Sequence, residues 1–571
     1  MKKIYSLLLL LLSYYVNGQI SFTAIPMDSS LIARDLKSNL GTILIQGKVN
    51  NTSTAYDSLC LKTYRNSVLK DSVYQDLSYS SGLAPFNLSY QIPAELDEYA
   101  IKIYGVKNKV QTLDTIINGI VAGDVYIIEG QSNAFALMRD GGSANGNKSE
   151  FIRSFASSDS NTAGFLTYLK WGIGDGDGNG SVTGHNYVGQ WGLRLARLLV
   201  DSMKIPIAIF NGACGGTPIS YYERPSNYKT NLNSNYAREY YRLQLTGLQN
   251  NVRAIIWSQG ETDAKNGTSI STYVNEFDTL EKAWKQDYPE LKKTYVFQTR
   301  NGGMPSYPFL NLQEMKEAER EIAIEHDSDI EIMSTSALRQ DSGDLHFDYK
   351  GGYEEFGNRV YNLIARDLYA ITPTREIDAP MITSAYLSDS TTLVVAENAD
   401  SLMRHNTDMP IQDYEIENAS GAVIDTIFLN KNKIIFQLSK YPGTGVTVSY
   451  LAQPADSGNW LTNTNNIEVL CFYKYPVDDS IAVLTGITSS GTPISMKVYP
   501  NPFHQLTTIA MGNTGTYFVE IDDIMGRQLK EEKFTGNQYL VNAEGLTNGI
   551  YFLRLFDEEK NLIGVTKVII Q

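Results

Sequence analysis

The sequence predicts a multidomain chain in which a central α/β domain with a parallel sheet is flanked by all-β sandwich domains. With 571 residues the chain is too long for one hydrophobic core, so several domains are expected. Short alternating apolar runs, broken by Asn, Ser, Gly and Pro clusters, occupy residues 20–118 and return after residue 378; this pattern is typical of β-sandwiches. Between them, strand-like runs alternate with helical patterns, which predicts βαβ units.

The chain begins with features of a secretory signal peptide, predicted for residues 1–18. Lys2 and Lys3 precede an apolar run through Leu12, and cleavage is expected after Gly18. This run is too short to span a membrane, and no later segment is apolar for long enough to do so. We therefore expect an exported protein without a membrane span, whose first folded domain is a β-sandwich at 19–118.

The central domain is predicted at 119–372. Its strand-like runs are 125–128, 205–210, 253–257, 294–298 and 329–334. Helical patterns lie between them, for example at 188–203, where apolar residues recur at spacings of three and four, and the domain is expected to close with a helix at 349–369. The carboxyl ends of parallel strands meet at one edge of the sheet, where ligands bind.

After the central domain, two blocks of the sequence again show the alternating apolar pattern of β-strands. Residues 378–476 are predicted to form a second sandwich. A linker rich in Ser, Gly and Thr, from Thr488 to Pro493, then leads to a terminal β domain at 490–571. The terminal block contains four segments in order: VYPNPF, GTYFVEIDDIMGRQL, NGIYFLRLF and VTKVII.

Composition excludes several classes of function. The net charge is −15 and the pI is about 5.0, so nucleic acid and anionic membrane surfaces are poor partners. Only Cys60, Cys214 and Cys471 occur, which excludes a disulfide scaffold and leaves room for one bridge, for instance between Cys60 and Cys471. Cys214 lies in a glycine-rich motif, where a small buried residue is favoured over a nucleophile.

The stretch GDVYIIEGQSN, from Gly123 to Asn133, indicates a nucleophile. A short apolar strand breaks at Gly130 and delivers Ser132 onto a sharp turn at the carboxyl end of the strand. Such turns are common, and most only reverse the chain. Two later segments strengthen the interpretation: WSQGETD at 257–263 and DLHFD at 344–348 supply a polar donor and a histidine.

A serine nucleophile needs a base, and the chain has five histidines. His405 and His504 lie outside the central domain, His326 ends a helical pattern, and His185 lies in a glycine-rich loop. His346 follows the last predicted strand and precedes the final helix, so it should lie at the same sheet edge as Ser132. Asp341, Asp344 and Asp348 are the candidate carboxylates to orient His346.

The blocks GQSN, NGACGGTPI (211–219), IIWSQGETDA (255–264) and DLHFD resemble those of SGNH-type esterases. The similarity covers roughly residues 120–370 and is greatest to the sialate O-acetylesterase-like branch. In that branch the carboxylate stands two residues before the histidine, so the resemblance favours Asp344, with Asp341 and Asp348 as alternatives. It implies a three-layer, SGNH/flavodoxin-like sheet domain. The terminal block resembles the C-terminal sorting domain of the type IX secretion system, which implies export through secretion machinery.

Ester hydrolysis also needs donors for the oxyanion of the tetrahedral intermediate. The candidates are backbone N–H groups of Ser132, Gly215 and Gly216 and the side-chain amide of Gln259. Glu261 and Asp263 are expected to hold the Gln259 loop by hydrogen bonds. A less favoured alternative makes them paired catalytic carboxylates.

Neither a metal nor a cofactor is expected. DGDGNGSV at Asp175–Val182 matches the first half of a calcium loop, but position twelve is Asn186 instead of a bidentate Glu, so a loop at the rim of the substrate site is favoured. No His or Cys cluster has the spacing of a metal site.

These features predict a secreted or cell-surface carbohydrate O-acetylesterase. Its expected partner is an O-acetylated carbohydrate, either sialic acid or an acetylated plant polysaccharide such as xylan. The alternative function is a non-catalytic surface adhesin that binds glycans through its sandwiches.

Overall fold

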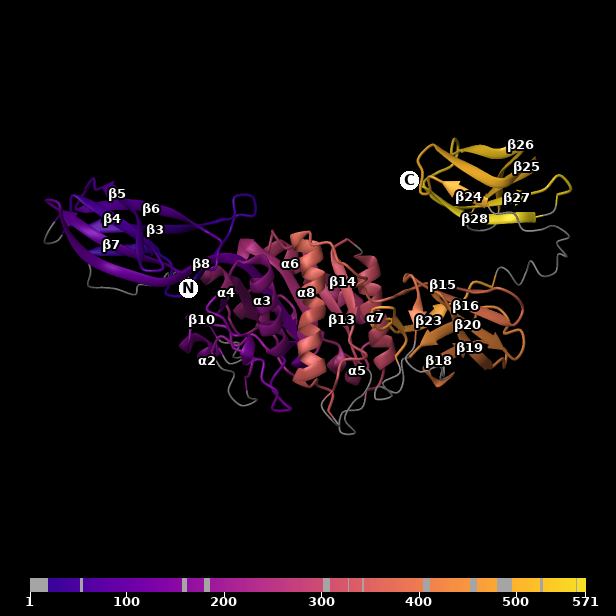
Figure 1. Cartoon of the computed structure of the whole chain (residues 1–571), viewed down its shortest axis with the longest axis horizontal. Coiled ribbons are helices and arrows are strands. Elements are labelled where there is room, and N and C mark those ends of the chain that lie inside the picture. The colour runs from indigo at the N-terminus through magenta and orange to yellow at the C-terminus, as the bar shows by residue number, and fades with distance from the viewer. Residues whose placement is uncertain are drawn as a thin grey trace, which may run out of the picture. The chain divides into compact units, whose positions relative to one another are not determined.

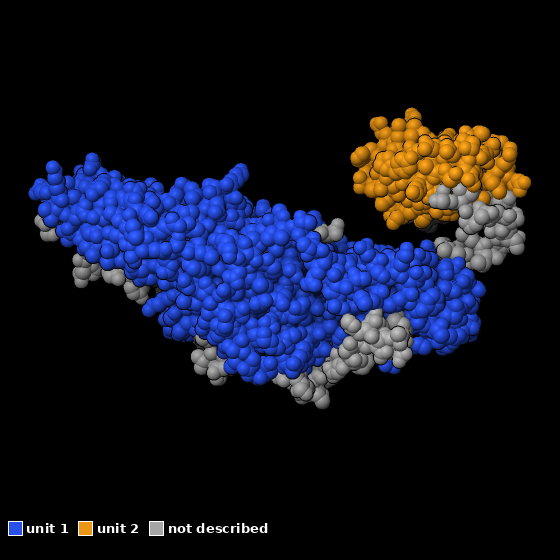
Figure 2. All heavy atoms as spheres, viewed as in Figure 1, with its two compact units in different colours: residues 1–479 blue, residues 480–571 orange. Residues whose placement is uncertain are grey.

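The computed structural model divides the chain into two compact units, residues 1–479 and 480–571 (Figure 2). It describes residues 19–51, 55–156, 162–178, 185–300, 309–326, 328–340, 344–403, 411–451, 460–479, 496–523, 527–560 and 562–571. The predicted signal peptide and the Thr488–Pro493 linker lie outside these residues. The protein is multidomain and mostly β, with helices gathered in the middle of the first unit (Figure 1).

The first unit begins with two packed antiparallel sheets. One has the order β1-β3-β6, and the other pairs β5, β4, β7 and the start of β8. Alternate residues of the strands, such as Ile43, Ile45 and Leu61, are fully buried between the sheets. The strands are β1 (Ile20–Ala24), β2 (Leu31–Ala33), β3 (Leu40–Asn50), β4 (Ser58–Arg65), β5 (Val68–Asp76), β6 (Leu83–Pro93), β7 (Tyr99–Lys107) and β8 (Val110–Gly130).

Strand β8 crosses the boundary that the sequence predicts at residue 118. Its first half pairs with β7, and its second half, from Asp124 on, pairs in parallel with β11 and β12. The burial pattern changes where the partners change. Residues 110–119 are exposed or half-buried, whereas 120–130 are all buried. One continuous strand therefore links the first sandwich to the central sheet.

The central sheet has the order β10-β9-β11-β8-β12-β13-β14, and all neighbours except β9 and β10 are parallel. Consecutive residues of β8 enter opposite cores. Tyr126 and Ile128 pack in the core that contains α3 and α8, and Val125 and Ile127 pack in the core that contains α4, α6 and α7. The strands are β9 (Ile152–Phe155), β10 (Trp171–Ile173), β11 (Ile207–Asn211), β12 (Val252–Ser258), β13 (Lys293–Gln298) and β14 (Ile330–Ser334).

Helices connect these strands and cover both faces of the sheet. Ser234 and Ser269 cap α4 and α6 by accepting hydrogen bonds from backbone N–H groups of the first turn. The helices are α1 (Ser132–Phe135), α2 (Thr162–Thr167), α3 (Gln190–Met203), α4 (Asn235–Thr246), α5 (Glu261–Asn266), α6 (Ile270–Asp287), α7 (Leu312–Glu325) and α8 (Glu354–Tyr369). No helix in the described parts of the chain is long and apolar enough to cross a membrane.

Antiparallel strands follow in both remaining blocks. In the first unit these are β15 (Ile382–Leu387), β16 (Thr392–Glu397), β17 (Leu402–Met403), β18 (Tyr414–Glu417), β19 (Ile424–Asn430), β20 (Lys433–Leu438), β21 (Thr447–Tyr450), β22 (Thr462–Asn463) and β23 (Phe472–Pro476). The second unit contains β24 (Met496–Tyr499), β25 (Leu506–Asp523), β26 (Gln528–Asn542), β27 (Gly549–Phe556) and β28 (Leu562–Ile570) around its own core. The three cysteines are free, so Cys60 and Cys471 do not pair.

Candidate functional site

Ser132 begins α1 directly after β8 ends, and the turn between them requires a glycine. Gly130 has a φ of 125°, and a Cβ at this position would lie 2.1 Å from the carbonyl oxygen of Ser258 on the neighbouring strand. The N–H of Gln131 donates to the same oxygen at 3.0 Å. Ser132 is therefore held, partly exposed, at the carboxyl end of β8.

The two strands beside β8 bring the other predicted loops to Ser132. Asn211 of β11 is in register with Ile128, and Ser258 of β12 is in register with Gly130. The loop after β11 approaches so closely that a Cβ on Gly215 would lie 3.7 Å from the Cβ of Ser132. The backbone of Gly215 thus lies beside the candidate nucleophile. Gly216 has a φ of 70°, a conformation that favours glycine.

Hydrogen bonds fix the loop after β11 against the serine turn. The N–H of Cys214 donates to the carbonyl of Gly130 at 2.9 Å, and the Tyr222 hydroxyl donates to the same carbonyl. Asp263 accepts from the N–H of Ile219 at 2.9 Å, which joins this loop to the segment after β12. Cys214 is half-buried in this loop.

The side chain of Gln259 is buried and bonded within the protein. Its Nε2 lies 2.6 Å from Asp263 Oδ2, 3.2 Å from the carbonyl of Thr217 and 3.3 Å from Gln131 Oε1, and it donates to these oxygens. Its Oε1 accepts from the Tyr273 hydroxyl at 2.9 Å. The amide joins the loops after β8, β11 and β12, so its donors are directed into the protein interior.

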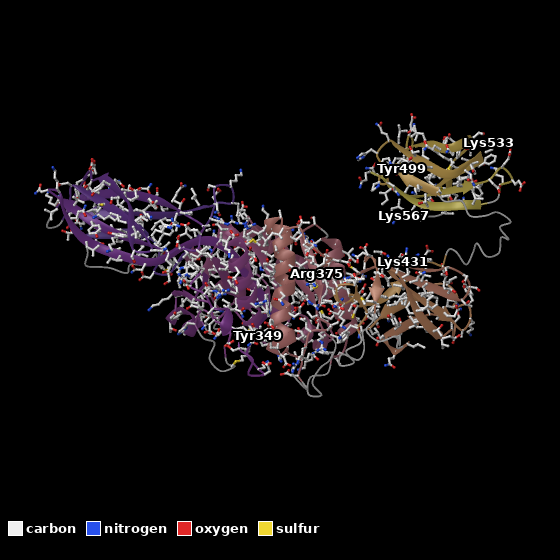
Figure 3. All side chains as sticks on the ribbon, in the orientation of Figure 1. Tyr349, Arg375, Lys431, Tyr499, Lys533 and Lys567 are labelled. Atoms are coloured by element: carbon white, nitrogen blue, oxygen red, sulfur yellow. The ribbon has the colours of Figure 1, made fainter. Side chains whose placement is uncertain are left out.

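His346 and Asp344 meet in the segment between β14 and α8. Nδ1 of His346 lies 2.6 Å from Oδ1 of Asp344, and His346 is 7% exposed. Partial burial alone would raise the pKa of Asp344, but His346, the Arg139 guanidinium and the N–H of Leu345 outweigh burial and lower this pKa. The segment leads to Tyr349, which is labelled in Figure 3.

The two alternative carboxylates are placed differently. Asp348 is buried and forms an ion pair with Arg339, with 2.5 Å between Oδ2 and Nε. Asp341 lies outside the described residues. Of the two candidates that the structure describes, Asp344 bonds the imidazole of His346, and Asp348 pairs with Arg339.

Asn133 ties the serine turn to the histidine segment. Its Nδ2 donates to the carbonyl of Leu345, the residue before His346, at 3.3 Å and to Glu261 Oε1 at 2.7 Å. Its Oδ1 accepts from the Tyr353 hydroxyl at 3.0 Å. Burial raises the pKa of Glu261. The residues that flank Asn133 and Leu345 are the candidate nucleophile and base, so this side chain fixes their segments together.

The sequence analysis missed Arg139. Its Nη1 lies 2.9 Å from Asp344 Oδ2, and its Nη2 lies 3.3 Å from His346 Nε2. The guanidinium therefore contacts both members of the candidate pair. A lone arginine in a loop carries no motif, and its position depends on tertiary packing alone.

The other described histidines have structural partners. His185 stacks on Tyr168 with 3.6 Å between ring centroids, and the Nδ1 of His504 lies 2.6 Å from the carbonyl of Gln571. His326, the residue directly after α7, lies 2.7 Å from Asp278 of α6 and forms a group of potential metal ligands with it and Glu325. Neither helix carries a predicted catalytic residue. His405 lies outside the described residues.

The calcium-like loop is described in part, since residues 179–184 lie outside the described ranges. Asp175 forms an ion pair with Lys148 at 2.6 Å, and Asp177 accepts from the N–H of Ala144 at 2.7 Å and from the Ser143 hydroxyl. These carboxylates are thus bonded to protein donors.

Comparison with known proteins identifies two parts of the chain. Residues 122–366 match the family model of carbohydrate esterase, sialic acid-specific acetylesterase, and residues 497–571 match that of the secretion system C-terminal sorting domain. The sorting domain indicates export, to the cell surface or the medium. A search of the curated proteins found no match.

Among solved structures, a carbohydrate acetylesterase from Xanthomonas citri is similar over 79% of this chain and 98% of its own, with a TM-score of 0.53 and 17% identity, which shows a shared fold. A protein from Arabidopsis thaliana (43% of this chain and 98% of its own, TM-score 0.34, 20% identity) and a carbohydrate acetylesterase from Sinorhizobium meliloti (43% and 99%, TM-score 0.27, 10% identity) also match. The resemblances predicted from the motifs are therefore confirmed: the chain carries a segment that matches carbohydrate esterases, followed by a secretion sorting domain.

Proposed function

We propose that the protein is a secreted serine esterase that removes O-acetyl groups from carbohydrates, with its active site on an SGNH/flavodoxin-like, three-layer domain at 119–372. The observation that carries the proposal is the bond between His346 Nδ1 and Asp344, in a segment that Asn133 joins to the Ser132 turn. The family match of residues 122–366 supports an esterase, and the sorting tail supports a secreted one. These findings do not favour the alternative of a non-catalytic glycan-binding adhesin.

In this mechanism Ser132 Oγ attacks the acetyl carbonyl while His346 Nε2 accepts the serine proton. Asp344, kept ionised by its lowered pKa, accepts the Nδ1–H bond and stabilises the imidazolium that forms. His346 then protonates the sugar oxygen, which leaves. Water, activated by the same imidazole, attacks the acetyl-enzyme and releases acetate.

The backbone N–H groups of Ser132 and Gly215 are the proposed donors to the oxyanion, with Gly216 next to them in the same glycine loop. Because the amide of Gln259 is bonded to Asp263 and Thr217, we assign it chiefly to holding these donors in position. A donor that is fixed before the reaction contributes about 3 kcal/mol to transition-state stabilisation.

The test is release of acetate from O-acetylated sialic acid and from acetylated xylan, with 4-nitrophenyl acetate as a small reference ester. Ser132→Ala should abolish release from all three without loss of thermal stability, because one hydroxyl on a surface turn adds little to folding. Ser202→Ala, on the exposed surface of α3, serves as a matched control and should retain full activity. A folded Ser132→Ala variant with near wild-type turnover would remove Ser132 from the mechanism.

A further inference from the structure

Arg139 lies seven residues after Ser132, and its guanidinium contacts both the candidate base and the carboxylate that orients it. Its Nη2 is 3.3 Å from Nε2 of His346, and its Nη1 forms an ion pair with Asp344 at 2.9 Å. The arginine side chain is 31% exposed, so ligands can reach it from solvent. The guanidinium thus contacts the catalytic histidine and remains accessible.

The direction of the hydrogen bond between Arg139 and His346 follows from chemistry. The ionised Asp344 carboxylate can only accept, so Nδ1 of the imidazole carries the proton, and Nε2 of the neutral ring has the lone pair. A guanidinium can only donate. Arg139 therefore donates to the lone pair that must accept the Ser132 proton during catalysis.

The contact with Nε2 is the weaker of the two bonds of Arg139. At 3.3 Å, it is longer than the ion pair with Asp344 and has a neutral acceptor. A carboxylate is a stronger partner for a guanidinium, because its hydrogen bonds are charge-assisted and geometrically matched. A negatively charged oxygen near the ester would displace Nε2 as acceptor.

We propose that Arg139 is a specificity-determining residue that moves its Nη2 donor from His346 Nε2 in the empty site to a carboxylate of the substrate sugar, which frees the base. The site would then select acetyl esters of acidic sugars over neutral ones, and the carboxylate would increase the reactivity of the enzyme as well as its affinity. This inference rests on the proposed esterase function and assigns a residue that determines its selectivity.

The experiment compares one O-acetylated uronic acid with its methyl ester, which has the same acetyl group but no charge. Acetate is measured, so that cleavage of the methyl ester does not contribute. Wild type should favour the free acid in kcat/KM by about 10- to 100-fold, the range of one charge-assisted hydrogen bond. Arg139→Gln should reduce this ratio to about 1. Its kcat/KM should fall on the free acid and rise on the methyl ester, because release of acetate from the methyl ester no longer requires displacement of the arginine. Arg139→Lys should retain part of the preference.

Arg197→Gln is the matched control. Arg197 forms an exposed ion pair with Asp201 on α3, and this variant should keep the wild-type ratio. An Arg139→Gln enzyme that keeps the ratio, or that loses activity equally on both esters, would overturn the proposal, because support of Asp344 alone would affect both substrates alike. Hydrolysis of 4-nitrophenyl acetate by wild type tests the esterase function separately. If that fails, both proposals fail, whereas activity without a preference for the acid overturns this one alone.

Discussion

Substitution of Asn133 by Ala tests whether one side chain couples the nucleophile to the base. Asn133 is 3% exposed and makes three side-chain hydrogen bonds, to Leu345, Glu261 and Tyr353. The substitution leaves all three partners without this bond in the interior. At about 1 to 1.5 kcal/mol for each bond, the free energy of unfolding should fall by about 3 to 4.5 kcal/mol.

The substitution should also impair catalysis in the molecules that remain folded. Without Asn133, the Ser132 turn loses its hydrogen bonds to Leu345 and Tyr353, which lie on either side of His346 in sequence. A displacement of about 1 Å between reacting groups costs about 100-fold in rate. We therefore expect kcat for 4-nitrophenyl acetate to fall about 100-fold when measured well below the melting temperature, where the variant is folded.

Asn186 offers a matched control. It is 4% exposed and also makes three side-chain hydrogen bonds, to Ser154, Lys170 and Tyr168, none of which belongs to the serine turn or the histidine segment. Asn186→Ala should lose similar stability, with about 1 kcal/mol more because its φ of 63° disfavours Ala, yet retain kcat. Denaturant unfolding gives the free energy of unfolding of both variants, and steady-state kinetics gives their kcat. Near wild-type kcat in Asn133→Ala, or an equal loss of kcat in Asn186→Ala, would refute the coupling.

Three further predictions concern the donor, the pH profile and the tail. Gln259→Ala should lower both kcat and the free energy of unfolding, the latter by about 2 to 3 kcal/mol, because Asp263 loses a buried donor. If the Gln259→Ala variant instead keeps the wild-type melting temperature but has a lower kcat, the amide contacts the oxyanion directly. The rate should rise with pH as His346 loses its proton, because only the neutral imidazole accepts the serine proton. The lowered pKa of Asp344 keeps this carboxylate ionised throughout that rise, so Asp344→Asn should lower the rate at every pH. An Asp344→Asn variant that only shifts the pH profile would contradict this role. Deletion of 490–571 should leave esterase activity intact but block export from the native host, and a truncated protein that still reaches the medium would contradict the sorting role.

Much of the central sheet could be predicted from sequence because its strands are apolar throughout. The runs at 253–257 and 294–298 agree with β12 and β13 to within one residue, since strands buried on both faces stand out from the polar loops around them. The short strands β9 and β10 were missed, because three or four residues carry no measurable period. The boundary at residue 118 cuts through β8, since composition changes there while the backbone continues as one strand.

For the site, sequence identified residue types better than contacts. Asp344 could be favoured as the partner of His346 because the motifs resemble a branch in which the carboxylate stands two residues before the histidine. Sequence proximity alone does not decide, since Asp348 is equally near and pairs with Arg339. Arg139 could not be found, because its neighbours are more than two hundred residues away in sequence. For Gln259, the sequence indicated a functional polar side chain directly after a buried strand. The direction of its amide, however, depends on partners such as Asp263 and Tyr273, which only the folded loops bring together.

The order of the central strands explains which parts of the site the fold fixes. After β8 the chain builds β9, β10 and β11 on one side of it and then crosses to build β12, β13 and β14 on the other. The crevice of such a sheet lies at the carboxyl ends of the strands where the direction reverses, here at Gly130 between Asn211 and Ser258. Topology alone thus brings together the serine turn and the loops that follow β11 and β12.

The histidine segment follows β14 at the edge of the sheet, so it has to return across β13 and β12, and the order of the strands does not specify where it stops. Bonds from the chain after β8 help to fix that position: Arg139 contacts Asp344 and His346, and the buried Asn133 donates to Leu345. Of these, Asn133 lies next to Ser132, which is why its loss should impair catalysis more than the loss of an equally buried asparagine elsewhere.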